Sequence, residues 1–161
     1  MAYLSSDDYD WDIFVSYAHV DDMSLLDGAN GWVTRFKKCL EMKLAQKLGR
    51  PSACSLWMDH ELRGGQPITP SILEKVRRSA ILLVVLSRGY VASEWCQREL
   101  ETFTGFIARG QARSVFVIER DLIRETEVPD SLVDLKRSRF WKSYLPRIPM
   151  TAVHTQIWVR T

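Results

Sequence analysis

The stretch SAILLVVLS, residues 79–87, decides the fold. Its apolar side chains are continuous rather than alternating with polar ones, so a strand built from it needs apolar partners on both of its faces. Shorter continuous runs occur at 13–15, 56–58 and 115–118, with a weak one at 140–141. Such runs predict a parallel sheet that is covered by helices on both sides.

The segments between these runs carry helical patterns. Apolar residues recur every four positions from Trp32 to Leu48, and Gly49 supplies a stop. Thr69 and Pro70 predict the start of a second helix, whose buried stripe is formed by Ile72, Leu73 and Val76. Ser93 predicts the N-cap of a third helix that ends near Gly110, with Cys96, Leu100, Phe103 and Ile107 along its buried face.

Alternation of strands and helices gives right-handed parallel crossovers. We therefore expect an α/β fold: a flavodoxin-like, doubly wound sheet of about five parallel strands, flanked by helices. With 161 residues, the chain fits one domain over residues 1–161. Residues 18–31 and 144–161 match neither pattern.

Composition places the chain among ordinary globular proteins, with 46% hydrophobic and 26% charged residues. The longest apolar run has seven residues (80–86), whereas a membrane span needs about 20. Cys39, Cys54 and Cys96 form no Cys-x-x-Cys pair, which favours free thiols in a reducing compartment. We therefore expect a cytoplasmic protein without a membrane span.

Charge is unevenly spread, since six basic residues and no acidic one follow Asp134. Nucleic-acid binding through this basic tail is one candidate function, although a solvated basic flank accounts for it more simply.

Most signatures of metal and nucleotide sites are missing. No Gly-x-Gly-x-x-Gly, phosphate loop or Gly-x-Ser-x-Gly elbow occurs. His60 and Glu61 begin like a zinc-protease helix, but Gly64 occupies the place of its second histidine. We expect neither a metal nor a bound cofactor. A hydrolytic triad of Ser16, His19 and Asp21 is disfavoured, because nothing places the serine on a strained turn beside a base.

Doubly wound sheets bind ligands where the strand order reverses, at the carboxyl ends of the first and third strands. Here those ends are Ser16-Tyr17-Ala18 and Ser87-Arg88-Gly89. The helix that begins at Ser93 starts at the same edge. On it Trp95 and Glu99 lie four residues apart, so we expect an aromatic ring and a carboxylate on one side of the helix.

Several segments, taken in register, resemble the Toll/interleukin-1 receptor (TIR) domain family over residues 9–141. Residues 12–17 resemble the first box of the family. The second strand of the family and the loop that follows it are resembled by Trp57-Met58-Asp59 with Leu62, Arg63, Gly64 and Gly65. The strongest match comprises 72–79, 83–87 and then Tyr90, Ser93, Trp95-Cys96 and Glu99-Leu100. Phe140-Trp141 resembles the third box. The final helix of the family is not evident after Trp141, and residues 142–161 stay unassigned.

The resemblance divides the functional candidates in two. One branch of the family cleaves NAD+ with a glutamate that matches Glu99, four residues after a tryptophan that matches Trp95. Membership of that branch implies an NAD+ glycohydrolase, with NAD+ as substrate, that acts in immune, antiviral or cell-death signalling and is activated by self-association. The alternative is a non-enzymatic adaptor that works only through TIR–TIR contacts.

The same resemblance assigns candidate roles to individual residues. Glu99 is the candidate catalytic residue. Trp95 would stack on nicotinamide, and the loop after the second strand would gate the cleft and contact a neighbouring subunit. The candidate substrate-binding residues are Trp95, Ser16, Tyr17, Ala18, His19, Asp59, Leu62, Gly64 and Ser87. Gly65 and Gln66 replace the Pro-Gly pair of receptor-type members, so partners of animal receptors are not carried over.

Overall fold

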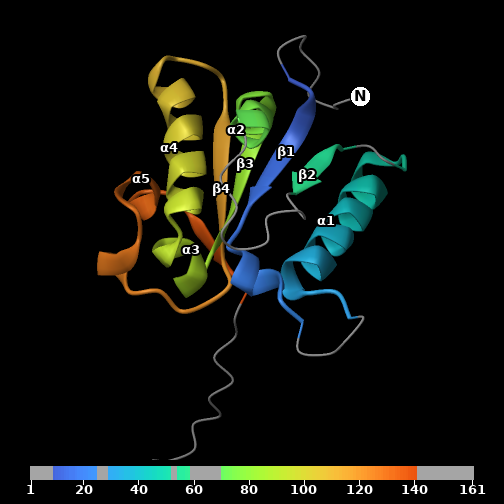
Figure 1. The fold of residues 1–161 in the computed structure, drawn as a ribbon. Coiled ribbons are helices and arrows are strands. Elements are labelled where there is room, and N and C mark those ends of the chain that lie inside the picture. Colours follow the sequence, from blue (N-terminus) through green and yellow to red (C-terminus); the bar gives the residue numbers. More distant parts are fainter. Residues whose placement is uncertain (1–8, 25–28, 52–53, 59–69, 141–161) are drawn as a thin grey trace, which may run out of the picture.

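The computed structural model describes residues 9–24, 29–51, 54–58 and 70–140. Its five-stranded sheet has the order β2-β1-β3-β4-β5, and every neighbouring pair is parallel (Figure 1). The strands are β1 (Trp11–Ser16), β2 (Leu56–Met58), β3 (Ser79–Leu86), β4 (Ser114–Glu119) and β5 (Arg137–Arg139). The chain leaves β1 on one side to form β2 and returns to form β3 on the other, so the winding reverses between β1 and β3. The predicted doubly wound α/β sheet is confirmed.

Helices cover both faces of this sheet. Their bounds are η1 (His19–Asp22), α1 (Trp32–Leu48), α2 (Pro70–Arg77), α3 (Arg88–Ala92), α4 (Glu94–Ala108), η2 (Glu125–Glu127) and α5 (Asp130–Val133). Figure 1 shows α1 on one side of the sheet and α3, α4 and α5 on the other. The three helices expected from sequence are confirmed as α1, α2 and α4. The short elements η1, α3, η2 and α5 were not predicted, because one or two turns leave no measurable period.

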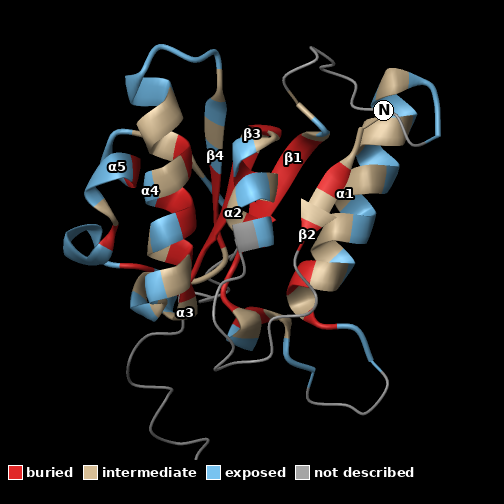
Figure 2. Cartoon of the chain, turned by 45° about the horizontal axis from the view of Figure 1, so that its top comes forward, coloured by how far each residue is buried: buried red, intermediate tan, exposed pale blue. Residues whose placement is uncertain are grey.

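Two hydrophobic clusters explain the continuous apolar run of β3. Leu83 and Val85 face α1, together with residues of β1 and β2. Leu82, Val84 and Leu86 face the opposite way and pack with residues of α2, α4 and α5. Successive side chains of a strand point to opposite faces, so a strand with helices on both sides is apolar throughout. Figure 2 shows this buried band through the middle of the sheet.

The helix ends are stabilised by two different means. The Ser93 side chain accepts a hydrogen bond from the Cys96 backbone N–H at 3.3 Å, as predicted. Gly49 ends α1 in the left-handed conformation, with φ 70°. The start of α1 is capped from a distance, because Asp22 of η1 accepts hydrogen bonds from the Thr34 backbone N–H at 2.7 Å and the Thr34 hydroxyl at 2.6 Å. This cap fixes the far end of the long β1–α1 connection.

The last strand lies earlier in the chain than predicted. The sequence suggested residues 140–141, of which Trp141 lies outside the described residues, whereas β5 comprises Arg137–Arg139 and pairs with 117–119 of β4. Phe140 follows the strand, and its ring lies edge-on to those of Trp32 and Phe36 at 6.2 Å and 5.2 Å. The residues of this edge strand are polar, and Arg137 is held by ion pairs and not by apolar packing, so hydrophobicity did not mark the strand.

Two of the three cysteines lie in environments that suppress the reactive thiolate. Burial is the main cause that raises the pKa of Cys54 to about 12, with Asp12 adding to it, and burial beside Glu99 raises the pKa of Cys96 to about 12. Cys39 is exposed. We expect an aromatic disulfide reagent at pH 8 to label Cys39 about 100-fold faster or more than the other two. Native labelling followed by peptide mass spectrometry measures this, and equal labelling of Cys54 and Cys39 would contradict the environments described.

Candidate functional site

The segments that follow β1 and β3 pack against each other at the carboxyl edge of the sheet. Gly89, in the first turn of α3, touches η1: a Cβ there would lie 2.6 Å from Val20 Cγ1 and 3.1 Å from Ala18 Cβ. A side chain at this position would have to displace Val20, so glycine permits the close approach. The predicted meeting of the two strand ends is confirmed (Figure 1).

Glu99 projects from α4 toward the end of β1. Its residue is 6% exposed, and its Oε2 accepts a hydrogen bond from the Ser16 hydroxyl at 2.5 Å. Ser16, the last residue of β1, is itself buried. Glu99 lies on the buried side of α4 with Cys96, Leu100 and Phe103, where an apolar side chain would be ordinary. A carboxylate in such a place is costly unless hydrogen bonds compensate it, which makes it a candidate functional group.

Tyr90 of α3 joins the same buried network. Its hydroxyl lies 3.3 Å from Ser16 Oγ and 3.3 Å from the Cys96 carbonyl oxygen. Complete burial raises the pKa of Tyr90 well above its usual value, so the hydroxyl keeps its proton throughout the physiological range. In the sequence, Tyr90 stands out only as part of the resemblance to the TIR family. Burial of a hydroxyl beside the site is a tertiary property that its position in the sequence did not reveal.

Ser87 and Asp21 form a second polar cluster at the same edge. The Ser87 hydroxyl donates to Asp21 Oδ2 at 2.5 Å and accepts from the Tyr90 backbone N–H at 2.9 Å, which caps α3. Arg120 Nη1 donates to Asp21 Oδ1 at 2.9 Å. Burial raises the pKa of Asp21 above its usual value, against the opposing effects of Ser87 and Arg120. Ser16, His19 and Asp21 therefore do not form a triad: Ser16 is bonded to Glu99, and Asp21 is bonded to Ser87 and Arg120.

Three further candidates lie directly after β1. Tyr17 and Ala18 are buried. The rings of Tyr17 and His19 are 5.6 Å apart and tilted by 38°. His19 Nε2 is buried and has no hydrogen-bond partner. A buried polar nitrogen without a partner is uncommon in native structures, so a ligand atom at this position would satisfy it.

Trp95 lies one turn before Glu99 on α4 and is half-buried. The guanidinium of Arg98 lies over its ring, 5.3 Å from the centroid. The indole therefore already holds a cation in the present structure, which is the type of partner that its electron-rich face attracts. The remaining three candidates, Asp59, Leu62 and Gly64, lie outside the described residues.

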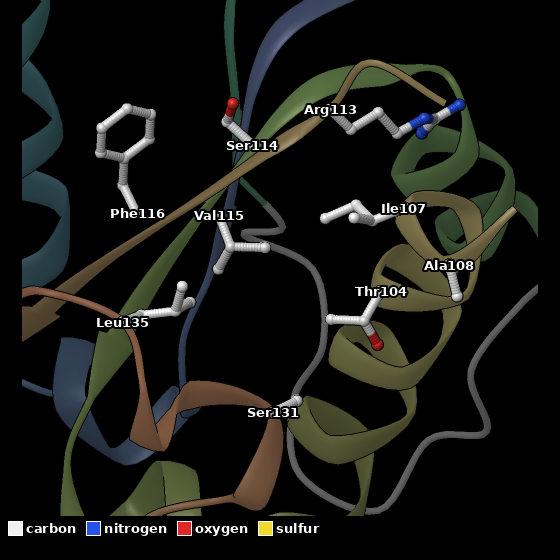
Figure 3. A pocket seen from close by; sticks show the side chains of 9 residues that line it. All are labelled: Thr104, Ile107, Ala108, Arg113, Ser114, Val115, Phe116, Ser131 and Leu135. Carbon is white, nitrogen blue, oxygen red and sulfur yellow. The ribbon is translucent and has the colours of Figure 1, made fainter. Parts of the chain in front are cut away.

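Two pockets lined by described residues lie away from Glu99. One, of about 610 Å³, lies between the last turns of α4 and the first half of β4, where Ile107 and Val115 face each other (Figure 3). Ile107 was expected to be buried, but it is 37% exposed because this end of α4 borders that pocket. A second, of about 560 Å³, lies at the carboxyl edge between α3 and the segment after β4; it is lined by Arg88, Val91, Ala92, Leu122, Ile123, Arg124 and Glu127.

Part of the basic tail is neutralised within the fold. Arg137 Nε lies 2.8 Å from Glu119 Oε1, and a second nitrogen of Arg137 pairs with Glu125. Arg139 Nε lies 3.2 Å from Glu119 Oε2. These ion pairs leave less positive charge for a phosphate backbone than the sequence suggested, which weakens the nucleic-acid alternative.

Within the described ranges, no three His, Cys, Asp or Glu side chains lie close enough to hold a metal ion. Among the helices of that same part of the chain, none is both long and apolar enough to span a bilayer.

The chain is similar to known proteins at two levels. It is 39% identical over 44 residues to disease resistance-like protein DSC2 and 36% identical over 55 residues to disease resistance protein TAO1, both from Arabidopsis thaliana. These matches cover 27% and 34% of the chain and only 4% and 5% of those proteins. In structure it is similar to the TIR domain of the Toll-related receptor TRR-2 from Hydra magnipapillata, with a TM-score of 0.52 and 13% identity. That likeness covers 81% of this chain and 84% of the other, and it supports the fold.

The family assignment comes from a match over most of the chain. The family model described as "TIR domain" matches residues 13–147, which include every described strand except the first two residues of β1. Together with the parallel sheet and the packing of α3 and α4 beside β1, this match shows that the chain belongs to the TIR domain family.

Proposed function

We propose that this chain is an NAD+ glycohydrolase of the TIR family that releases nicotinamide together with ADP-ribose or a cyclised variant. The observation that carries the proposal is the buried carboxylate of Glu99, which the Ser16 hydroxyl holds at 2.5 Å where the sheet reverses its winding. A buried carboxylate at the reversal point of a doubly wound sheet lies where such sheets bind ligands, and buried charged groups are concentrated at functional sites.

The chemistry needs one carboxylate. In NAD+ the bond between C1′ of the ribose and the pyridinium nitrogen breaks, and its electron pair neutralises the positive nitrogen of the departing nicotinamide. No proton has to be supplied, whereas ordinary glycosidases need a second carboxyl group as general acid. The ribose becomes an oxocarbenium-like cation, which water or a nitrogen of the adenine ring then captures. When water adds, it loses a proton to a base.

Glu99 would act on the cationic ribose. Its negative charge opposes the positive charge that develops at C1′, and a carboxylate oxygen accepts hydrogen bonds from ribose hydroxyls. Preorganised groups of this kind contribute about 3 kcal/mol to the transition state. Because Ser16 already holds the carboxylate, little reorganisation is needed during the reaction.

Trp95 and the residues after β1 would bind the remainder of the substrate. The cationic pyridinium ring would stack on the Trp95 indole, either on the face opposite Arg98 or in its place. His19 Nε2, buried and without a partner, would bond a polar atom of the substrate. Tyr17 and Ala18 would form the floor beneath it, and Asp59, Leu62 and Gly64 would complete the site.

We further propose that the domain acts in immune or cell-death signalling and that self-association activates it. Its family, together with the partial likeness to two plant disease resistance proteins, supports this role. The second candidate function is the adaptor that signals through TIR–TIR contacts alone.

Turnover of NAD+ distinguishes the two candidates. We expect purified protein to release nicotinamide from NAD+ at a specific rate that increases with protein concentration, because assembly completes the site. Liquid chromatography of nicotinamide, ADP-ribose and cyclic products, over a wide range of protein concentrations, measures this. No release at any concentration, from protein that is folded by circular dichroism, would favour the adaptor.

A further inference from the structure

The number of hydrogens available around Ser16 determines which groups donate and which accept. A serine hydroxyl carries one hydrogen and two acceptor lone pairs, and an ionised carboxylate only accepts. Ser16 Oγ lies 2.5 Å from Glu99 Oε2 and 3.3 Å from the Tyr90 hydroxyl. With Glu99 ionised, as the proposed reaction requires, the single hydrogen of Ser16 goes to Glu99 in the shorter, charge-assisted bond. In the longer contact Ser16 is the acceptor, and the single hydroxyl hydrogen of Tyr90 is shared between Ser16 Oγ and the Cys96 carbonyl oxygen, each 3.3 Å away.

Tyr90 lies on α3 and contacts both β1 and α4. Its hydroxyl lies 3.3 Å from Ser16 on β1, and the same hydroxyl lies 3.3 Å from the Cys96 carbonyl in the first turn of α4. Its backbone N–H is held by Ser87, and its side chain has no exposed surface. The tyrosine thus connects the strand that carries Ser16 with the helix that carries Glu99.

We propose that Tyr90 is a positioning residue for Glu99, acting through the Ser16 hydroxyl. By donating to Ser16 Oγ it fixes the rotamer in which Ser16 donates to Glu99, and the two bonds polarise each other. The carboxylate is thereby held in the orientation that the ribose cation requires. This inference rests on the proposed NAD+ cleavage and adds to it a residue that contacts neither the substrate nor the carboxylate.

A merely structural tyrosine predicts something different. In that case, loss of the hydroxyl would lower stability and the fraction of folded enzyme, but each folded molecule would turn over substrate as before. Ser79 provides a matched control, because it also carries a buried hydroxyl that makes a hydrogen bond. It is the first residue of β3, at the end of the strand away from the site, and its hydroxyl donates to the Lys75 carbonyl at 2.7 Å. Ser79→Ala removes a buried hydrogen bond far from Glu99.

The experiment is a double-mutant cycle on NAD+ turnover with Tyr90→Phe, Ser16→Ala and the double variant, normalised to folded protein. We expect Tyr90→Phe to lower kcat about 10-fold with KM changed less than about two-fold, because it misplaces a group used in the transition state. In the Ser16→Ala background, Tyr90→Phe should have no further effect, since its target is gone. Ser79→Ala should keep the wild-type kcat.

The kinetics of these variants decide whether Tyr90 positions Glu99 through Ser16. Independent, multiplying effects of Tyr90→Phe and Ser16→Ala would overturn positioning through Ser16, as would a wild-type kcat in Tyr90→Phe. Should Tyr90→Phe not fold, Ser16→Thr, which keeps the hydroxyl, is expected to retain more kcat than Ser16→Ala, and equality of the two would overturn the proposal. A wild-type protein that never cleaves NAD+ would refute the proposed function itself, a result distinct from activity that is insensitive to Tyr90.

Discussion

Glu99→Gln is expected to lower nicotinamide release by at least about 100-fold while the protein stays folded. Glutamine keeps the shape of the side chain, and its carbonyl oxygen can still accept the hydrogen bond from Ser16. What disappears is the negative charge opposite the ribose cation. Because that charge acts mainly in the transition state, the loss should fall on kcat, with KM changed far less.

The control for this variant is Glu101→Gln on the same helix. Glu101 is exposed, so the substitution makes an identical change of charge where solvent screens it. Nicotinamide release by Glu101→Gln should equal that of the wild type. If Glu99→Gln retained wild-type turnover with an unchanged unfolding midpoint, the carboxylate would not be catalytic. That result would favour the non-enzymatic adaptor, which acts through TIR–TIR contacts alone.

Gly31→Ala is expected to lower the free energy of unfolding by about 3 kcal/mol, from overpacking against backbone atoms. A Cβ at Gly31 would lie 1.7 Å from the Asp22 carbonyl oxygen and 2.4 Å from its Oδ1. The backbone of Gly31 has φ −65° and ψ 175°, which any residue adopts, so the constraint is space alone. The methyl group would push Asp22 off the start of α1 and break its hydrogen bonds to Thr34.

Gly105→Ala provides the contrast, with the opposite sign. Gly105 lies inside α4, and the nearest atom to a Cβ there is a guanidinium nitrogen of Arg109 at 3.8 Å. Alanine in a helix interior is more favourable than glycine by about 0.5–1 kcal/mol. Urea unfolding followed by circular dichroism measures both variants. A Gly31→Ala protein as stable as the wild type would show that η1 and the start of α1 do not make the contact described.

Parts of the site could be predicted because they depend on spacing along one element. The position of Glu99 on a helix that begins at Ser93, and the strand ends at Ser16 and Ser87, followed from helical period, capping chemistry and parallel-sheet topology. The contact between Ser16 and Glu99 did not follow, because these residues are separated by 83 positions and meet only when α4 packs across the end of β1. Tyr90 was missed as a site residue for the same reason.

The sequence by itself determined that this is a parallel, doubly wound sheet, because continuous apolar runs and helical stripes record which faces are buried. It also placed an acidic side chain on the third predicted helix. Only the tertiary structure decided that this acid is buried and held by Ser16, that Tyr90 lies behind Ser16, and that the last strand is a polar edge at Arg137–Arg139. The physical reason is that burial and hydrogen bonding between distant residues depend on how elements pack, whereas periodicity reports only the face that each element buries.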